Sequence, residues 1–279
     1  MEACQNRIGA KMSTTYKKII CERKGPNQEV LWITLNDEKM MNALSDTMQQ
    51  ELLCILEEIA FDNDIRCVVL KGAGDKAFSS GGDIKLFKSL NVVSAYDLSY
   101  QRGNTIQHLM NYMEKPVIAA VNGYCFAGGM ELALSCDFIY ASESAKFGLL
   151  EINLGLLPGW GGTVRLPRKI PVNRAKEMIY RGEIIDAREA YQWGLVNRVL
   201  PSEEDLYKEV EKAVSDMMAK PPLSLRAAKN VINNSITCES MEAALAIERG
   251  AVMWLVSSED SKEGVDAFVG KRKPNFKGR

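Results

Sequence analysis

The sequence predicts an α/β fold that ends in a purely helical region. Short apolar runs typical of buried strands alternate with helical patterns over the first two hundred residues, and only helical patterns follow Pro201. The 279 residues suffice for one large domain or for a domain with an appendage. We therefore expect a disordered leader over residues 1–15, a core that carries the active site over 16–200 and a helical oligomerisation region over 201–279.

The composition excludes several classes of protein. With 46% hydrophobic and 25% charged residues, the chain resembles ordinary soluble globular proteins. A net charge of −1 gives no reason to expect nucleic acid or an anionic membrane surface as the main partner. No apolar run reaches the roughly 18 residues of a membrane span. Seven scattered cysteines without a CxxC pair argue against a disulfide framework or a zinc site, and favour a cytoplasmic location.

Turn and cap signals mark the first elements of the core. Residues 16–23 and 30–35 are predicted as two strands of a hairpin around Gly25 and Pro26. Ser45 can cap a helix whose apolar residues recur at helical spacing as far as Ile59. Further along we expect a strand at 67–70, a loop at 72–80, a helix that Asp83 caps, and a longer helix over 93–113.

The stretch 116–151 combines an apolar strand with a helix that carries a single charge. After the strand at 116–121, Gly128 and Gly129 lead into a small apolar helix in which Glu131 is the only charged residue. No cation lies within four residues of Glu131, so a buried carboxylate there must shift its pKa or find partners. Glycines let a ligand approach the backbone, and the N–H groups of a helix start favour negative charge. The stretch therefore offers both an anion site and an acid or base.

The elements of the remaining chain are predicted from glycine and proline positions, which mark turns, and from the spacing of apolar residues. We expect a strand at 138–140, a glycine-rich turn at 158–163 with helices after it, a strand at 195–200, and helices at 205–219, 223–234, 241–256 and 260–270. His108, the only histidine, lies in a predicted helix. We interpret it as structural, which argues against a histidine-dependent triad or a multi-histidine metal site.

Three motifs occur in a fixed order along the chain. They are KAFSSGGDIK at 76–85, AAVNGY followed by AGGMELA within 119–133, and a pattern of glycines with Glu151, Pro158 and Arg165 within 147–166. Shorter matches lie at 42–45, 190–196 and 271–274. Together they resemble the signatures of the enoyl-CoA hydratase/isomerase (crotonase) superfamily, over about residues 16–279, and the hydratases fit best.

The resemblance implies a fold, an assembly and a class of ligand. The fold would be a crotonase-like spiral of repeated β-β-α turns, followed by a helical region used for trimerisation. Such proteins form trimers or dimers of trimers and bind acyl-CoA thioesters with no metal or redox cofactor. Coenzyme A would be part of the substrate, and neither nucleic acid nor a membrane is expected as a partner.

The resemblance also implies roles for single residues. The backbone N–H groups of Gly82 and Gly128 would bind the thioester oxygen as an oxyanion hole. Glu131 would accept a proton as water attacks the β-carbon, and Glu151 would donate one to the α-carbon. The implied reaction is the reversible addition of water across the 2,3 double bond of a 2-enoyl-CoA. Further substrate contacts are expected from Ala43, Leu44, Asp83, Ile84, Lys85 and Trp160.

Two departures from the commonest hydratase pattern leave the acyl group open. Leu149-Leu150 stands where a Gln-Pro pair is frequent, and Trp160 stands where a smaller residue is often found. Trp160 could shorten the acyl pocket or stack against a flat or cyclic acyl chain.

Other reactions of the superfamily remain alternatives: double-bond isomerisation, hydrolysis or decarboxylation. Isomerases commonly need only one acid or base, at the position of Glu151, so Glu131 favours water addition. A non-catalytic member that binds acyl-CoA or RNA is a further alternative. The near-neutral charge and the two glutamates argue against it. Asp83 could also serve only as a helix cap, and Lys85 only as a solvated residue.

Overall fold

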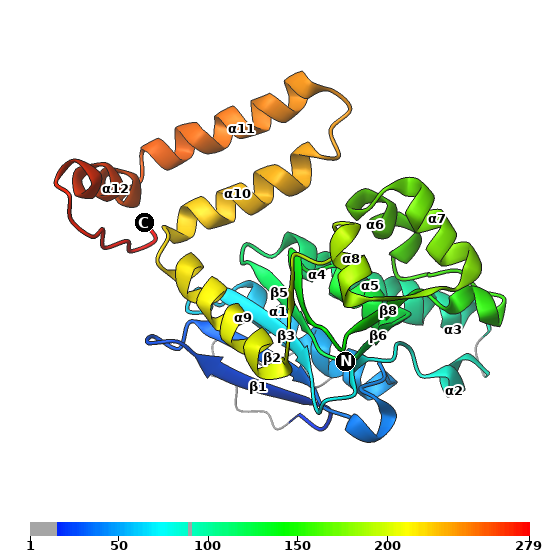
Figure 1. Cartoon of the computed structure of the whole chain (residues 1–279). Coiled ribbons are helices and arrows are strands. Elements are labelled where there is room, and N and C mark those ends of the chain that lie inside the picture. Colours follow the sequence, from blue (N-terminus) through cyan, green and yellow to red (C-terminus); the bar gives the residue numbers. More distant parts are fainter. Residues whose placement is uncertain (1–15, 89–90) are drawn as a thin grey trace.

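Strands that alternate between two sheets build the core (Figure 1). The computed structural model describes residues 16–88 and 91–279. In this part of the chain the strands are Ile19–Lys24 (β1), Val30–Leu35 (β2), Cys67–Gly72 (β3), Ala77–Ser79 (β4), Val117–Val121 (β5), Tyr124–Phe126 (β6), Phe138–Ser142 (β7), Lys146–Gly148 (β8), Ile184–Asp186 (β9) and Arg198–Leu200 (β10). The larger sheet has the order β1-β2-β3-β5-β7-β10 and the smaller one β4-β6-β8-β9.

Three successive segments of the chain follow the same path through these sheets. β3, β5 and β7 lie parallel in the larger sheet, and the strands that follow them, β4, β6 and β8, lie parallel to one another in the smaller sheet. β9 completes the smaller sheet and pairs with β8 in the antiparallel direction. Helical segments then return the chain to the larger sheet. This is the spiral of β-β-α turns that the sequence predicts.

Helices surround the two sheets. Those of the described residues are Asp46–Ala60 (α1), Ile84–Phe87 (α2), Val92–Tyr96 (α3), Thr105–Tyr112 (α4), Gly128–Leu134 (α5), Gly162–Lys169 (α6), Val172–Arg181 (α7), Ala187–Gln192 (α8), Glu203–Met218 (α9), Pro222–Ser235 (α10), Met241–Val256 (α11) and Glu259–Val269 (α12). A π-helical segment, Asp97–Asn104, joins α3 to α4, and short 3₁₀ turns lie at Glu38–Met40 and Glu151–Leu154. The predicted cap is present, since the Ser45 hydroxyl accepts the N–H of Met48.

The larger sheet is apolar on both faces. Along β2, Leu31 and Ile33 belong to the main core cluster, which α1 covers, whereas Trp32 between them belongs to a second cluster. Leu206 and Val210 of α9 cover this second face. Because successive side chains of a strand point to opposite faces, near-continuous apolar strands are expected for a sheet buried on both sides.

The sequence reading missed the small sheet. The predicted loop at 72–80 contains β4, and β6, β8 and β9 had no counterpart among the predicted strands. Each of these strands has three residues, too few for a period-of-two pattern to show. The helix predicted at 93–113 is present, but it passes through the π-helical segment instead of remaining α-helical throughout.

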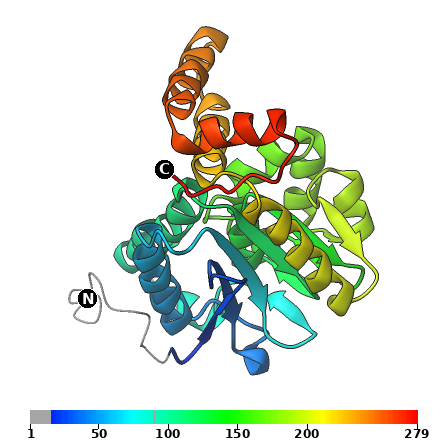
Figure 2. The ribbon, with the colours of Figure 1, turned by 90° about the vertical axis from the view of Figure 1, so that its left-hand side faces the viewer.

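The last three helices form a region of their own. α10 and α11 project side by side from the core, and α12 follows near their end (Figures 1 and 2). α11 has no buried residue although its sequence is largely apolar. No helix among the described residues is long and apolar enough to cross a membrane. The domain division at residue 200 and the cytoplasmic location stay predictions.

One lysine ties this region to the core. The Nζ atom of Lys229 on α10 donates to the carbonyl oxygens of Met110 and Lys115, at 3.0 and 2.8 Å, and to Oδ2 of Asp137 at 2.9 Å. The same Asp137 oxygen accepts the N–H of Val117 at the start of β5. Both charged side chains are largely buried, 8% and 20% exposed, so the pair is well shielded from water.

Candidate active site

Glu131 is buried and held by backbone amides. Its side chain lies on α5 with 2% of the residue exposed. Its Oε1 accepts the N–H groups of Trp160 at 2.7 Å and of Gly162 at 2.8 Å. A Cβ atom on Gly162 would lie 3.0 Å from this oxygen, so glycine lets the loop approach. Glu131 has no cation near it in the sequence, and its hydrogen-bond partners are backbone amides some thirty residues further along the chain.

Glu151 lies beside Glu131. It begins the 3₁₀ turn after β8, is half-buried, and its buried Oε2 has no hydrogen-bond partner among the described residues. Burial, followed by the charge of Glu151, raises the pKa of Glu131 to about 8. Burial also raises the pKa of Glu151. Both carboxyl groups therefore keep their protons to a higher pH than a solvated glutamate does, and each can act as an acid or a base.

The backbone amides of Gly82 and Gly128 lie close together at the start of α5. A Cβ atom on Gly128 would lie 3.4 Å from the Gly82 nitrogen, and a Cβ atom on Gly81 would lie 3.1 Å from the Gly128 nitrogen. Neither the Gly82 nor the Gly128 N–H donates a hydrogen bond to the described residues. Ala127, which precedes the second amide, has a φ of +48°, a conformation that alanine rarely adopts. Such strain is typical of functional sites, and here it lies directly before the Gly128 amide.

The residues that supply these amides and carboxyl groups all lie in the three sequence motifs. A family model described as enoyl-CoA hydratase/isomerase matches residues 25–279. The chain belongs to this family.

Its relatives in the enoyl-CoA hydratase/isomerase family are similar over nearly their whole length. A crotonyl-CoA hydratase of Syntrophomonas wolfei is 38% identical over 94% of this chain and 98% of its own. A 2,3-dehydroadipyl-CoA hydratase of Escherichia coli is 41% identical over 90% and 96%. The crystal structure of an enoyl-CoA hydratase from Bacillus anthracis superposes with a TM-score of 0.90 at 38% identity, covering 94% and 100%. The predicted crotonase-like fold and superfamily are thus confirmed.

The other residues expected at the substrate divide into two groups in this family member. Ala43 and Leu44 are buried beside the paired amides, and the Leu44 N–H donates to the Gly81 carbonyl oxygen at 2.8 Å. Ile84 and Lys85 are exposed and lie outside this cluster. Asp83 accepts the N–H of Lys85 at 3.0 Å, in agreement with the helix-cap reading. The roles of all six residues at the substrate stay predictions.

Arg165 and Gln107 fix the loop that contacts Glu131. Neither residue was assigned a role from the sequence. Nη1 of Arg165 donates to Oε1 of the fully buried Gln107 and to the carbonyl oxygen of Trp160. The N–H of Trp160 donates to Glu131, so the arginine positions the acid through the backbone of this residue. Arg165 stood in the third motif, whereas nothing in the sequence singled out Gln107.

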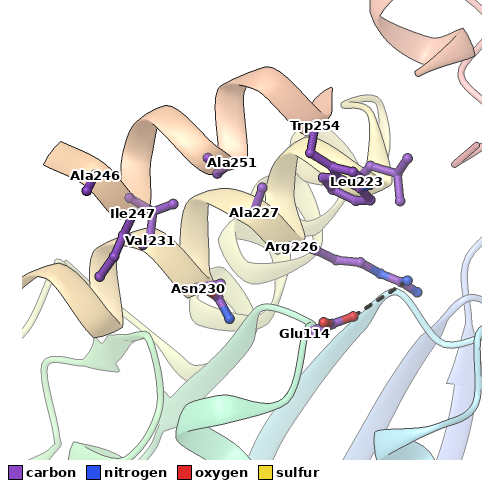
Figure 3. A pocket seen from close by; sticks show the side chains of 11 residues that line it. Glu114, Leu223, Arg226, Ala227, Asn230, Val231, Ala246, Ile247, Ala251 and Trp254 are labelled. Atoms are coloured by element: carbon purple, nitrogen blue, oxygen red, sulfur yellow. Dashed lines mark ion pairs between the residues drawn. The ribbon is translucent and has the colours of Figure 1, made fainter. Parts of the chain in front are cut away.

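A separate hollow of about 470 Å³ lies between α10 and α11 (Figure 3). An ion pair between Arg226 and Glu114, 3.8 Å long, lies at its edge, and neither Glu131 nor Glu151 lines it. Its apolar lining includes Leu223, Ala227, Val231, Ile247, Ala251 and Trp254. The hollow belongs to the helical region and offers no acid–base pair of the kind found at α5.

Ligands for a metal are absent from the described residues, where no group of three or more histidine, cysteine or acidic side chains gathers. His108 is exposed on α4 and packs its ring against Tyr112. The described cysteines with free thiols are Cys21, Cys67, Cys125, Cys136 and Cys238. Cys54 is not among them, because it is disulfide-bonded.

The raised pKa of Glu131 predicts that the free energy of unfolding falls as the pH rises. Between pH 4.5 and about 8 the folded protein binds more protons than the unfolded chain, so this contribution is full below pH 4.5 and is lost by about pH 8. Glu131→Gln removes the ionisation and can still accept both amide N–H groups. We expect the variant to be roughly 2–4 kcal/mol more stable than the wild type at pH 8 and about equal near pH 4.5. Urea unfolding at both pH values measures this, and a difference independent of pH would contradict it.

Proposed function

We propose that the protein is an enoyl-CoA hydratase, which adds water reversibly across the 2,3 double bond of a 2-enoyl-CoA thioester to give a 3-hydroxyacyl-CoA. The observation that carries the proposal is the coupled pair of Glu131 and Glu151 beside two unpaired glycine amides. Double-bond isomerisation needs only one acid or base, whereas addition of water needs a proton removed and a proton supplied. The names of the relatives, crotonyl-CoA and 2,3-dehydroadipyl-CoA hydratase, support the same reaction.

In this mechanism the thioester oxygen binds the N–H groups of Gly82 and Gly128. Negative charge grows on that oxygen as water adds to the β-carbon, and each preorganised donor lowers the barrier by roughly 3–4 kcal/mol. Coenzyme A is part of the substrate, and the residues of the site supply the acid and the base without a separate cofactor.

The two glutamates divide the proton transfers. Oε1 of Glu131 accepts two amide N–H groups, which favours the ionised form, and its other oxygen is left to take a proton from water. Oε2 of Glu151 accepts no hydrogen bond from the described residues and lies in a site that favours the protonated form. Burial raises the pKa of Glu131 to about 8, and the two amide N–H groups oppose this rise, so the ionised base forms as the pH approaches 8. We therefore assign the base to Glu131 and the acid to Glu151.

The test offers the purified protein a panel of linear, branched, cyclic and aromatic 2-enoyl-CoA thioesters. Hydration raises the mass of the thioester by one water molecule. Isomerisation leaves the mass unchanged, hydrolysis releases free coenzyme A, and decarboxylation releases carbon dioxide. A protein that raises the mass of no member of the panel is not a hydratase.

We also propose that the chain assembles as a homotrimer or a dimer of trimers through its helical region. The largely apolar α11 exposes Met241, Leu245, Val252, Met253, Trp254 and Val256. Exposed apolar surface of this extent is typical of a protein interface.

Trp254→Asp is expected to reduce the molar mass in solution from a multiple of three chains to one chain, because it places a charge in the interface. Light scattering after gel filtration measures the mass. Phe61→Asp is the control, since Phe61 is 88% exposed at the end of α1, outside the helical region. A wild-type protein with the mass of one chain would contradict the proposed assembly.

A further inference from the structure

The indole ring of Trp160 lies directly on Gly103. This glycine belongs to the π-helical segment Asp97–Asn104 and is buried. A Cβ atom on Gly103 would lie 2.7 Å from Cε2, 2.8 Å from Nε1 and 2.9 Å from Cδ2 of the indole. Non-bonded carbon atoms do not come this close, so only glycine at 103 leaves room for the ring.

The other edge of the same ring reaches the paired amides. Cε3 of Trp160 lies 3.6 Å from the position of a Cβ atom on Gly128. The indole therefore spans the space between Gly103 and Gly128.

The backbone of Trp160 is fixed on both sides of the ring. Its N–H donates to Glu131 and its carbonyl oxygen accepts from Arg165, which also bonds Gln107. Gln107 lies four residues after Gly103, so one helical turn separates the glycine that accepts the ring from the glutamine that anchors the loop. A ring fixed in this way acts as a rigid wall instead of a movable side chain.

We propose that Trp160, seated on Gly103, closes the acyl pocket just beyond the reacting carbons and restricts the substrate to 2-enoyl-CoA thioesters with short, unbranched acyl groups. The inference rests on the proposed hydratase reaction. With the thioester oxygen at the amides of Gly82 and Gly128 and the β-carbon at Glu131, the rest of the acyl chain must leave past Glu131. The ring of the residue that donates to Glu131 stands in this path.

The experiment measures kcat/KM for linear 2-enoyl-CoA thioesters of four, six, eight and ten carbons and for cinnamoyl-CoA. The wild type is expected to prefer four carbons over ten by about 100-fold or more, and to turn over cinnamoyl-CoA poorly. Trp160→Ala is expected to reduce the preference at least tenfold by raising kcat/KM for the long chains, since each methylene accommodated in an apolar pocket changes kcat/KM by about tenfold. Trp160→Phe, which keeps a flat ring, is expected to retain most of the preference.

Gly103→Ala tests the packing of the Trp160 indole against residue 103. Its Cβ pushes the indole toward the reacting carbons, so kcat/KM for the four-carbon substrate should fall at least tenfold. In the double variant Gly103→Ala/Trp160→Ala no ring remains to be displaced, and kcat/KM should return to the value of Trp160→Ala.

The outcomes separate this inference from the proposed function. If the wild type hydrates all chain lengths equally, or prefers cinnamoyl-CoA, Trp160 does not close the acyl pocket. The proposed hydratase reaction would still hold. Equal effects of Trp160→Ala on every chain length also overturn it. A wild type that hydrates none of these thioesters refutes the hydratase reaction itself.

Discussion

Glu131→Gln is expected to lower kcat for hydration of a 2-enoyl-CoA by a factor of roughly 10²–10⁴, the usual contribution of a general base. Glutamine keeps the shape of the side chain, and its oxygen can still accept the N–H groups of Trp160 and Gly162. The loop geometry should therefore survive while the ability to take a proton from water is lost. Initial rates of hydration and urea unfolding, measured on the same preparation, separate the two effects.

Glu151→Gln is expected to cost a similar factor, and the double variant little more than either single one. The two carboxyl groups act on one water molecule and one double bond, so the loss of either already stops the concerted use of both. Glu143→Gln serves as a matched control, because Glu143 pairs with Arg188 at the surface. If both single variants kept full activity, these two carboxyl groups would not be the acid and the base of the reaction.

Gly128→Ala is expected to reduce kcat/KM by at least about 10²–10³ without destabilising the fold. The added methyl group would make only ordinary contacts, 3.4 Å from the Gly82 nitrogen, 3.5 Å from Leu44 and 3.6 Å from Trp160. It would nevertheless occupy the place between the two amides that the thioester oxygen requires. Thermal unfolding should be unchanged, while a thioester should bind weakly and react slowly.

The neighbouring glycine supplies the control. A Cβ atom on Gly129 would lie 2.5 Å from the Ser79 carbonyl oxygen and 2.7 Å from the Ser79 Cβ. Gly129→Ala should therefore lower the unfolding temperature by several degrees, because backbone must move to admit it. If Gly128→Ala instead reduced stability as much as Gly129→Ala, its loss of activity would say nothing about an oxyanion hole.

Local sequence was sufficient for most of the elements of the core and for singling out Glu131. Long helices such as α1 and α11 follow from periodicity and serine caps, and the long strands follow from apolar runs. The lone charge in α5 pointed to Glu131 before any partner was known. The assignment of Glu151 and of the two amides came from motif resemblance, because a glutamate after a short strand carries no local signal of its own.

The supporting contacts could not be predicted, because they join distant segments. Gln107 bonds Arg165, which lies 58 residues away in the sequence. Gly103 contacts the indole ring of Trp160, and helix or strand propensities do not predict where a side-chain ring lies. The three-residue strands of the small sheet are fixed by their neighbours rather than by their own pattern. These contacts and short strands depend on how distant segments pack together in the folded core.

The buried pair of Lys229 and Asp137 makes the helical region inseparable from the rest of the molecule. A shortened protein that ended before α10 would leave the Asp137 carboxylate in a largely dry position with no counterion, and the carbonyl groups of Met110 and Lys115 without their donor. Losing one partner of a buried pair costs about 3–5 kcal/mol, a large fraction of the stability of a typical domain. Truncation at this boundary should therefore yield insoluble or partly unfolded material instead of a free-standing catalytic fragment.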